Sequence, residues 1–152
     1  MNHARMRLIA RVSVLLSALV IITGPAWAQD PGVRTGVSVD PDQFYLGAHL
    51  ETDPLVDRLH FRPNIELGVG DDRTVLSANM EFVYKFPRRR LWGLYAGGGP
   101  TINVTRRDER TRTDAGVNLL VGAEQSSGLF FEFKFGVVDS PNLKFGVGWT
   151  FR

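Results

Sequence analysis

The sequence predicts an all-β chain that closes into a single antiparallel, up-and-down barrel of eight strands. Three observations predict it: alternate residues are apolar along most of the chain, glycine and aromatic residues are frequent, and short turn sequences separate the alternating runs. Outside residues 1–28, no segment has a clear helical period. Because a parallel crossover needs about a dozen residues or more, turns this short predict an antiparallel meander, whose natural closure is a barrel.

Residues 1–28 have the layout of a secretory signal peptide. A basic stretch with three arginines leads into an apolar run (12–22), which ends shortly before the cleavage-site sequence Ala26-Trp27-Ala28. The apolar run is short against the roughly 20 residues of a membrane-spanning helix, which argues against an uncleaved anchor. We therefore expect a signal peptide over 1–28 and one barrel domain over 29–152.

Charge and cysteine content narrow the function classes. The chain holds 18 Lys and Arg against 16 Asp and Glu, and removal of the signal peptide, with its three arginines, leaves 15 against 16. A nucleic-acid partner is therefore not expected. The chain has no cysteine, so it has neither a lipoprotein acylation site nor a disulfide framework. No cofactor is predicted.

The first four strands are expected at residues 33–39, 43–51, 58–70 and 75–86. The first is short. In the other three, every second residue is apolar over runs about as long as the 9 to 11 residues of a tilted membrane strand. Their apolar faces include Phe44, Leu46, Leu59, Phe61, Leu76 and Phe82.

The last four strands are expected at residues 92–104, 114–124, 129–137 and 143–151, with the same alternation. Turn-forming residues separate most of the eight segments, as in Gly70-Asp-Asp-Arg73 and Gln125-Ser-Ser-Gly128. The segment from Thr105 to Arg112 is expected to be the longest loop on the outer side. Its four arginines and two acids favour a solvated loop, with contact to lipopolysaccharide phosphates as the alternative.

The charged residues decide which face of the barrel points inward. Within the predicted strands, the apolar face carries no charged residue. The opposite face carries His49, Glu51, Arg58, His60, Arg62, Glu66, Glu81, Lys85, Asp114, Glu124, Glu132, Lys134 and Lys144. Thirteen of the sixteen glycines have the parity of this charged face. On a hydrated exterior this bias has no packing reason, whereas in a narrow lumen glycine makes room for long side chains. The charged face is therefore expected inside a transmembrane barrel.

Aromatic residues of the apolar face support the same orientation. An even strand count puts both chain ends on the periplasmic side, and six aromatic residues are predicted near that end: Tyr84, Phe86, Trp92, Phe131, Trp149 and Phe151. Aromatic rings prefer the membrane interface, so we expect them to form a periplasmic belt. The alternative is an ordinary aromatic core.

With these features, residues 33–151 resemble the small eight-stranded outer-membrane barrels, of the OmpA transmembrane domain and OmpX type. The resemblance rests on the alternation, on the sequence Tyr95-Ala-Gly-Gly-Gly-Pro100 and on the aromatic last strand. It implies an outer membrane of Gram-negative type as the location. It also implies a monomer, with outer-membrane lipids, lipopolysaccharide and the barrel-assembly machinery as partners. The chain departs from the family in that Arg152 follows Phe151, where the family usually ends on an aromatic residue.

The predicted site residues are those that would form ion pairs within the lumen. The expected hairpin registers place Arg62 opposite Glu81 and Glu51 beside Arg58, and they set Glu132 and Lys134 against Gly148 and Gly146.

The same registers would set His49 opposite His60 close to Glu51, a weak candidate for a Zn²⁺ site. Lumen filling explains these residues without a metal. Catalysis is not expected, although some barrels of this kind modify lipid A, because neither histidine lies in a His-x-Ser arrangement or near the outer leaflet. The main alternative is a soluble, lipocalin-like periplasmic carrier with the apolar face turned inward, but a Gly-x-Trp in the first strand is absent. The sequence favours an integral outer-membrane barrel with a polar, side-chain-filled lumen, no wide pore, and a structural or surface-interaction role.

Overall fold

The computed structural model describes residues 29–138 and 143–152, which form eight β-strands. Their bounds are β1 Gln29–Val39, β2 Gln43–Thr52, β3 Leu59–Val69, β4 Thr74–Lys85, β5 Trp92–Arg107, β6 Arg110–Gln125, β7 Leu129–Val138 and β8 Leu143–Thr150. The predicted signal peptide lies outside the described residues. Within them, no helix is long and apolar enough to cross a membrane.

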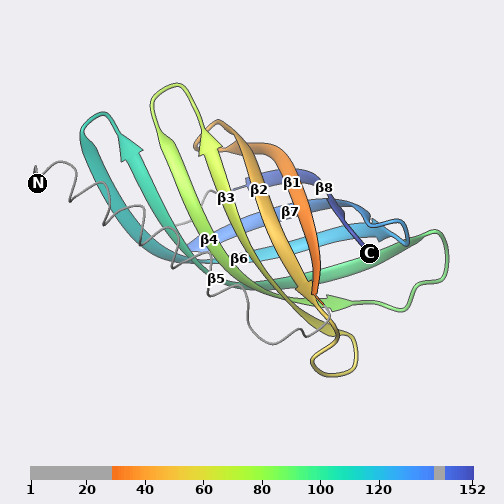
Figure 1. Cartoon of the computed structure of the whole chain (residues 1–152). Coiled ribbons are helices and arrows are strands. Elements are labelled where there is room, and N and C mark those ends of the chain that lie inside the picture. Colours follow the sequence, from red (N-terminus) through yellow and green to blue (C-terminus); the bar gives the residue numbers. More distant parts are fainter. Residues whose placement is uncertain (1–28, 139–142) are drawn as a thin grey trace, which may run out of the picture.

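The strands form one closed barrel. Each strand pairs antiparallel with the next, and β8 pairs with β1 to complete the ring (Figure 1). The β1–β2, β3–β4 and β5–β6 hairpins lie at one end of the barrel, which we call the hairpin end. The β2–β3, β4–β5 and β6–β7 turns lie at the other end with the C terminus, and we call it the terminus end. The predicted all-β, up-and-down, eight-stranded barrel is confirmed.

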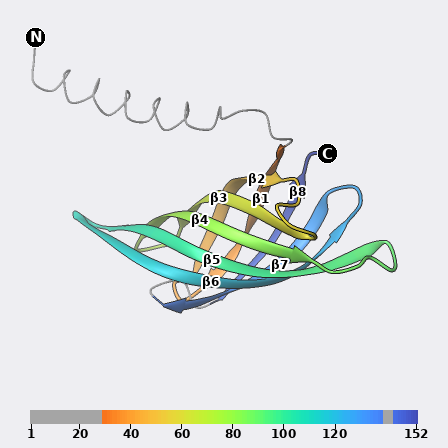
Figure 2. The same cartoon turned by 90° about the horizontal axis from the view of Figure 1, so that it is seen from below.

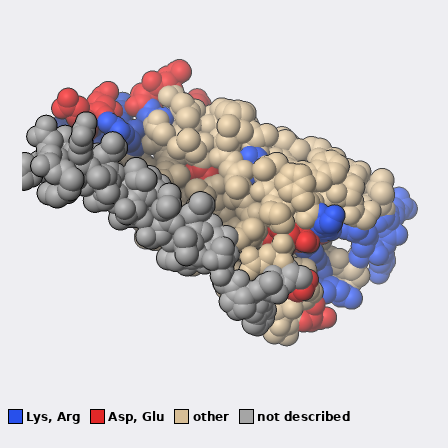
Figure 3. Space-filling view, viewed as in Figure 1, with Lys and Arg blue, Asp and Glu red and all other residues tan. Residues whose placement is uncertain are grey.

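The alternation of the sequence corresponds to an inward and an outward face. Charged residues on the predicted lumen face are buried, as in Arg62 (1% exposed) and Glu81 (0%), whereas Leu46 (58%) and Leu94 (63%) on the other face are exposed. Figure 3 shows the result as a band that is mostly free of charged side chains between the more highly charged ends of the barrel.

One predicted hairpin register is confirmed. The turn at Asp71 and Asp72 sets Arg62 opposite Glu81 and Asn64 opposite Asn79. A short turn between long strands leaves little freedom in the pairing, which explains this success.

Two other predicted registers are wrong. His49 lies opposite Asn64, not His60, because residues 55–59 make their own turn with a Val56–Leu59 bridge on the β3 side. On β7 and β8, Lys134 lies opposite Lys144 and Glu132 opposite Gly146, a shift of two residues from the predicted pairing. A shift of two or four residues keeps every side chain on its predicted face, so the alternation alone does not distinguish these registers.

The segment between Thr105 and Arg112 is a hairpin rather than a long loop. Strand pairing continues to Arg107 and Arg110, so only Asp108 and Glu109 form the turn, with Asp108 at φ 50°. This hairpin reaches beyond its neighbours at the hairpin end of the barrel (Figure 2).

Candidate functional site

The centre of the lumen holds a compact cluster of five charged side chains from four strands, β1, β3, β4 and β7. Lys134 Nζ lies 2.6 Å from both Glu66 Oε1 and Glu81 Oε1. Arg34 Nη1 lies 3.2 Å from Glu132 Oε1 and 3.4 Å from Glu66 Oε1. All five residues are buried. Because an isolated buried charge costs several kcal/mol, roughly balanced pairing is what allows these ions inside the barrel.

Arg62 connects this cluster to the terminus end of the lumen. Its guanidinium lies 3.2 Å from Glu132 Oε2 and 3.4 Å from Glu51 Oε2. It also lies over the Tyr95 ring at 4.6 Å, and the Tyr95 hydroxyl donates to Glu132 Oε2 at 2.9 Å. Arg62 therefore has both ionic and cation–π partners in a buried setting.

An apolar cluster fills the barrel beside these charges. Val83, Tyr95, Leu120 and Phe130 are at most 2% exposed and contact one another. Glycines make space for the aromatic rings: a Cβ at Gly122 would overlap Tyr95, and one at Gly148 would overlap Phe130. The predicted role of glycine in the lumen thus has a geometric basis here.

The partners of the lumen glycines differ from those that the sequence suggested. The wrong β7–β8 register had assigned Gly146 and Gly148 to the space around Lys134 and Glu132. A Cβ at Gly146 would instead overlap the Tyr45 hydroxyl.

At the terminus end, four charged residues form a second network. Glu51 and Glu124 both accept hydrogen bonds from Lys85 Nζ, and both accept from Arg152 Nη2, at 3.2 and 3.0 Å. Arg152 therefore folds back across the lumen mouth. The residue that departs from the family pattern makes specific contacts.

Asparagines link three strands near the middle of the barrel. Asn118 Nδ2 donates to Asn79 Oδ1 at 2.9 Å, and Asn79 Nδ2 donates to Asn64 Oδ1 at 2.7 Å. Such a chain satisfies polar groups that water would otherwise have to reach.

The structure places the predicted ion-pair residues in the lumen with one exception. Arg62 is opposite Glu81 in register, but its ion pairs run to Glu51 and Glu132. Arg58 is exposed, and Glu51 pairs with Lys85, Arg62 and Arg152 instead. Sequence reasoning missed Arg34, although its parity with Gly36 would have placed it inside.

The candidate metal ligands have separate partners. His49 Nε2 lies 3.0 Å from Thr150 Oγ1, whereas His60 Nδ1 lies 2.8 Å from the Thr52 carbonyl oxygen. Among residues 29–138 and 143–152, no group of three His, Cys, Asp or Glu side chains is arranged to hold a metal ion. The expected juxtaposition of His49 and His60 depended on the wrong β2–β3 register.

The aromatic residues proposed for a membrane belt lie on the outer face at the terminus end. Tyr84 and Phe86 are in edge-to-face contact at 5.3 Å, and Trp92 and Phe131 pack at 5.6 Å between ring centroids. Trp149 and Phe151 are 41% and 53% exposed.

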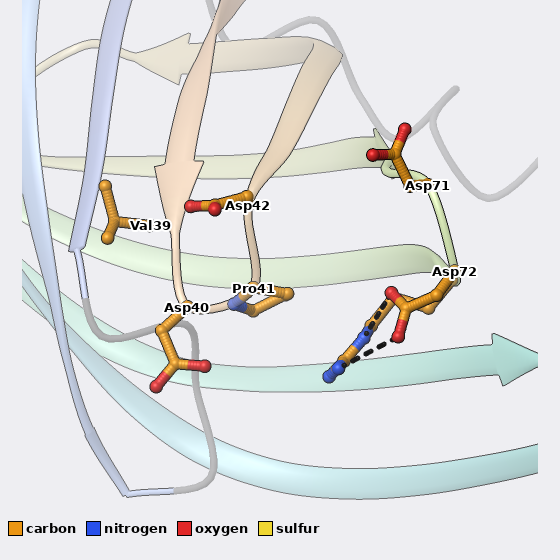
Figure 4. Close-up of a pocket in the computed structure, with 7 residues that line it drawn as sticks. Val39, Asp40, Pro41, Asp42, Asp71 and Asp72 are labelled. Carbon is orange, nitrogen blue, oxygen red and sulfur yellow. Dashed lines mark hydrogen bonds and ion pairs between the residues drawn. The ribbon is translucent and has the colours of Figure 1, made fainter.

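A hollow of about 430 Å³ opens at the hairpin end between the β1–β2 and β3–β4 hairpins (Figure 4). Its lining includes Asp40, Asp42, Asp71 and Asp72. Hydrogen bonds from Arg73 hold the pKa of the Asp72 carboxyl below its usual value. The hollow is thus acidic and partly neutralised by its own arginine.

The chain is a small eight-stranded β-barrel, closed and antiparallel, with an apolar outer wall and a charged interior. No protein-family model and no curated protein matches the chain. Among solved structures, it is similar to Neisserial surface protein A, with a TM-score of 0.62 and 14% identity over 81% of this chain and 96% of that one. It is also similar to the N-terminal β-barrel domain of Pseudomonas aeruginosa OprF, with a TM-score of 0.59 and 10% identity over 81% and 96%. The chain has the fold of the small outer-membrane barrels.

Proposed function

We propose that the chain is an integral outer-membrane protein, exported by the signal peptide of residues 1–28, which acts as a structural or surface component. The observation that carries this proposal is the reversal of polarity across the barrel wall. Large apolar side chains such as Met80 (57% exposed) and Leu94 (63%) cover the outside, while Glu66 and Arg62 (each 1%) lie inside. An apolar exterior of this extent is stable in lipid and aggregates in water.

Fractionation tests the membrane location. The protein is expected to leave the outer membrane only with detergent, and the folded barrel is expected to migrate faster on a gel than the boiled chain. Folded monomer recovered from the periplasm without detergent would contradict the proposal and favour a soluble carrier.

The lumen supports a structural role rather than transport through a wide pore. Charged and aromatic side chains occupy it from the centre to the terminus end, and each of the central ions has a partner of opposite charge. Single-channel recordings in planar bilayers are expected to show at most small conductance. A large, stable conductance would contradict a filled lumen.

The absence of catalysis is part of the proposal. His49 contacts a hydroxyl, that of Thr150, but within the described residues its Nδ1 atom has no hydrogen-bond partner, so no acid orients the imidazole as a catalytic base. Mass spectra of lipid A are expected to stay unchanged when the protein is overproduced. A new acylation state that depends on His49 would contradict this.

A further inference from the structure

The β2–β3 and β4–β5 turns at the terminus end carry three exposed arginines without ionic partners. Arg58, Arg89 and Arg90 are exposed, and within residues 29–138 and 143–152 they have no ion pair. Their neighbour Arg88, in contrast, lies 3.6 Å from Glu124 Oε1. Figure 3 shows basic side chains gathered at this end of the molecule.

These two turns are joined at the edge of the apolar wall. The backbone N–H of Lys85 donates to the carbonyl oxygen of Arg58 at 3.0 Å, which ties the β2–β3 turn to the end of β4. Tyr84 and Phe86, the aromatic pair of the outer face, flank Lys85. The arginines therefore stand where apolar wall gives way to charged surface, the level at which lipid headgroups meet a membrane protein.

The apolar wall is hollowed on the same strands. Small residues on neighbouring strands leave a groove of about 400 Å³, whose lining includes Ala48, Pro63, Ile65, Ala78 and Met80. Its lining is almost entirely apolar. Between this groove and the turns, Phe61 and Phe82 pack against each other at 5.1 Å.

The separation of Arg58 and the groove matches the length of a lipid. Pro63 follows Arg58 by five residues, which is about 17 Å along an extended strand and about 13 Å along the barrel axis for a tilt near 40°. Half of the hydrocarbon core of a bilayer is about 15 Å thick. A headgroup at Arg58 would therefore place its acyl chain at the groove.

We propose that this surface binds one anionic glycerophospholipid of the periplasmic leaflet, with its phosphate held by Arg58, Arg89 and Arg90 and one acyl chain in the groove. The inference rests on the proposed membrane location and adds a ligand to it. A guanidinium forms paired, charge-assisted hydrogen bonds to phosphate oxygens. An anionic lipid is preferred because the three arginines outnumber the exposed acids of the β2–β3 turn, Asp53 and Asp57, whereas a zwitterionic headgroup brings its own cation.

The outer hairpin provides an internal contrast. Arg107 and Arg112 are paired with Asp72 and Asp114, and Asp108 and Glu109 form the turn between the arginine-bearing strands. Two of its arginines are thus ion-paired, and no residue of this hairpin lines the groove, so a comparable lipid preference is not expected there.

Native mass spectrometry of the detergent-extracted protein with equal amounts of phosphatidylglycerol and phosphatidylcholine tests the proposal. The protein is expected to retain phosphatidylglycerol in excess. Arg89→Gln with Arg90→Gln should lower that excess by about fivefold for each arginine removed. Arg106→Gln with Arg110→Gln removes the same charge from the outer hairpin and should leave the preference within twofold of the original. Ala78→Leu, which narrows the groove, should reduce retention of both lipids and keep their ratio.

Each outcome distinguishes the lipid site from the membrane location. Equal retention of both lipids, or an equal loss in the two double variants, would overturn the lipid site while detergent-dependent extraction and heat-modifiable migration still hold. Selective retention of lipopolysaccharide at these arginines would overturn the assignment to the periplasmic leaflet. Heat-modifiable migration of the Arg89→Gln, Arg90→Gln variant shows that its barrel is folded, so a lost preference then belongs to the arginines.

Discussion

The inward and outward faces of the same eight strands differ in almost every property. The inward face buries a mixed set of acids, bases, amides and aromatic rings, with Glu81 and Val83 both 0% exposed two residues apart on β4. The outward face of β4 exposes Met80 and Phe82 at 57% and 44%. Two residues along the strand keep the same face, and one residue changes it.

The two faces are therefore stabilised by different interactions. Inside, ions are tolerated because each has partners, so the interior depends on matched pairs and on shape. Outside, burial in the protein contributes little, so under the proposed membrane location the stability of that face depends on the surrounding lipid. Substitutions should therefore have opposite chemical preferences on the two faces.

Loss of a lumen cation is expected to have the largest effect. Arg62→Met removes the cation that joins Glu51 to Glu132 while keeping a long side chain, and should lower the free energy of unfolding by about 3–5 kcal/mol. Urea unfolding in lipid vesicles, followed by tryptophan fluorescence, measures it. Arg106→Met, at an exposed position, should change stability by less than about 0.5 kcal/mol. An equal loss in both variants would show that Arg62 has no special role.

A charge on the outer wall is the converse test. Leu119 on β6 is 52% exposed, and Leu119→Arg should cost about 2–4 kcal/mol in vesicles, because arginine is unfavourable in the hydrocarbon region. Thr111→Arg on the protruding hairpin is the matched control and should have almost no effect. If Leu119→Arg changes stability by less than about 0.5 kcal/mol, the outer wall faces water and not lipid.

Shape inside the lumen should matter to an intermediate degree. Gly122→Val places a side chain into the Tyr95 ring and should cost about 1–3 kcal/mol. Ala115→Val on the outward face adds similar volume without a neighbour to displace. Comparable unfolding midpoints for the two variants would contradict tight packing around Tyr95.

The smallest effect is expected at the chain end. The Arg152 side chain is 28% exposed, so its ion pairs with Glu51 and Glu124 should contribute less than about 1 kcal/mol, and Arg152→Gln should change stability by no more than that. The fraction of chain that reaches the outer membrane, measured on the same variant, tests assembly separately. A stability loss above about 2 kcal/mol would make Arg152 a structural element of the lumen mouth.

Alternation and turn residues were sufficient to predict the barrel and its inward face. The β3–β4 register followed from the short Asp71-Asp72 turn, but the turn between Glu51 and Leu59 contains a bend of its own that no parity rule shows. Ion-pair partners within the lumen depend on strand register. The wrong β2–β3 register therefore assigned Arg58 to Glu51 as its partner, whereas the structure has Arg62 there. Strand parity survives a shift of two or four residues, whereas contacts do not.

The hairpin around Asp108 escaped sequence reasoning for a different reason. Beyond Thr105, β5 and β6 extend out of the barrel and are polar on both faces. Alternation of apolar and polar residues identifies only strands that have one buried face. The inward position of the apolar residues Leu120 and Val83 was also not predicted, because hydrophobicity alone assigns a leucine or valine to the apolar outer face. Only the positions of their charged neighbours reveal their side.

Spin-label accessibility along β6 distinguishes a lipid-facing outer wall from a wall that faces water. The chain has no cysteine, so a nitroxide can be attached at single cysteines introduced in turn at residues 117–121. Collisions with oxygen, which concentrates in lipid, are expected to be high at 117, 119 and 121 and low at 118 and 120 in reconstituted vesicles. High collision rates with a water-soluble nickel chelate at 117, 119 and 121 would show that water covers the apolar wall, and would contradict a lipid-facing outer surface.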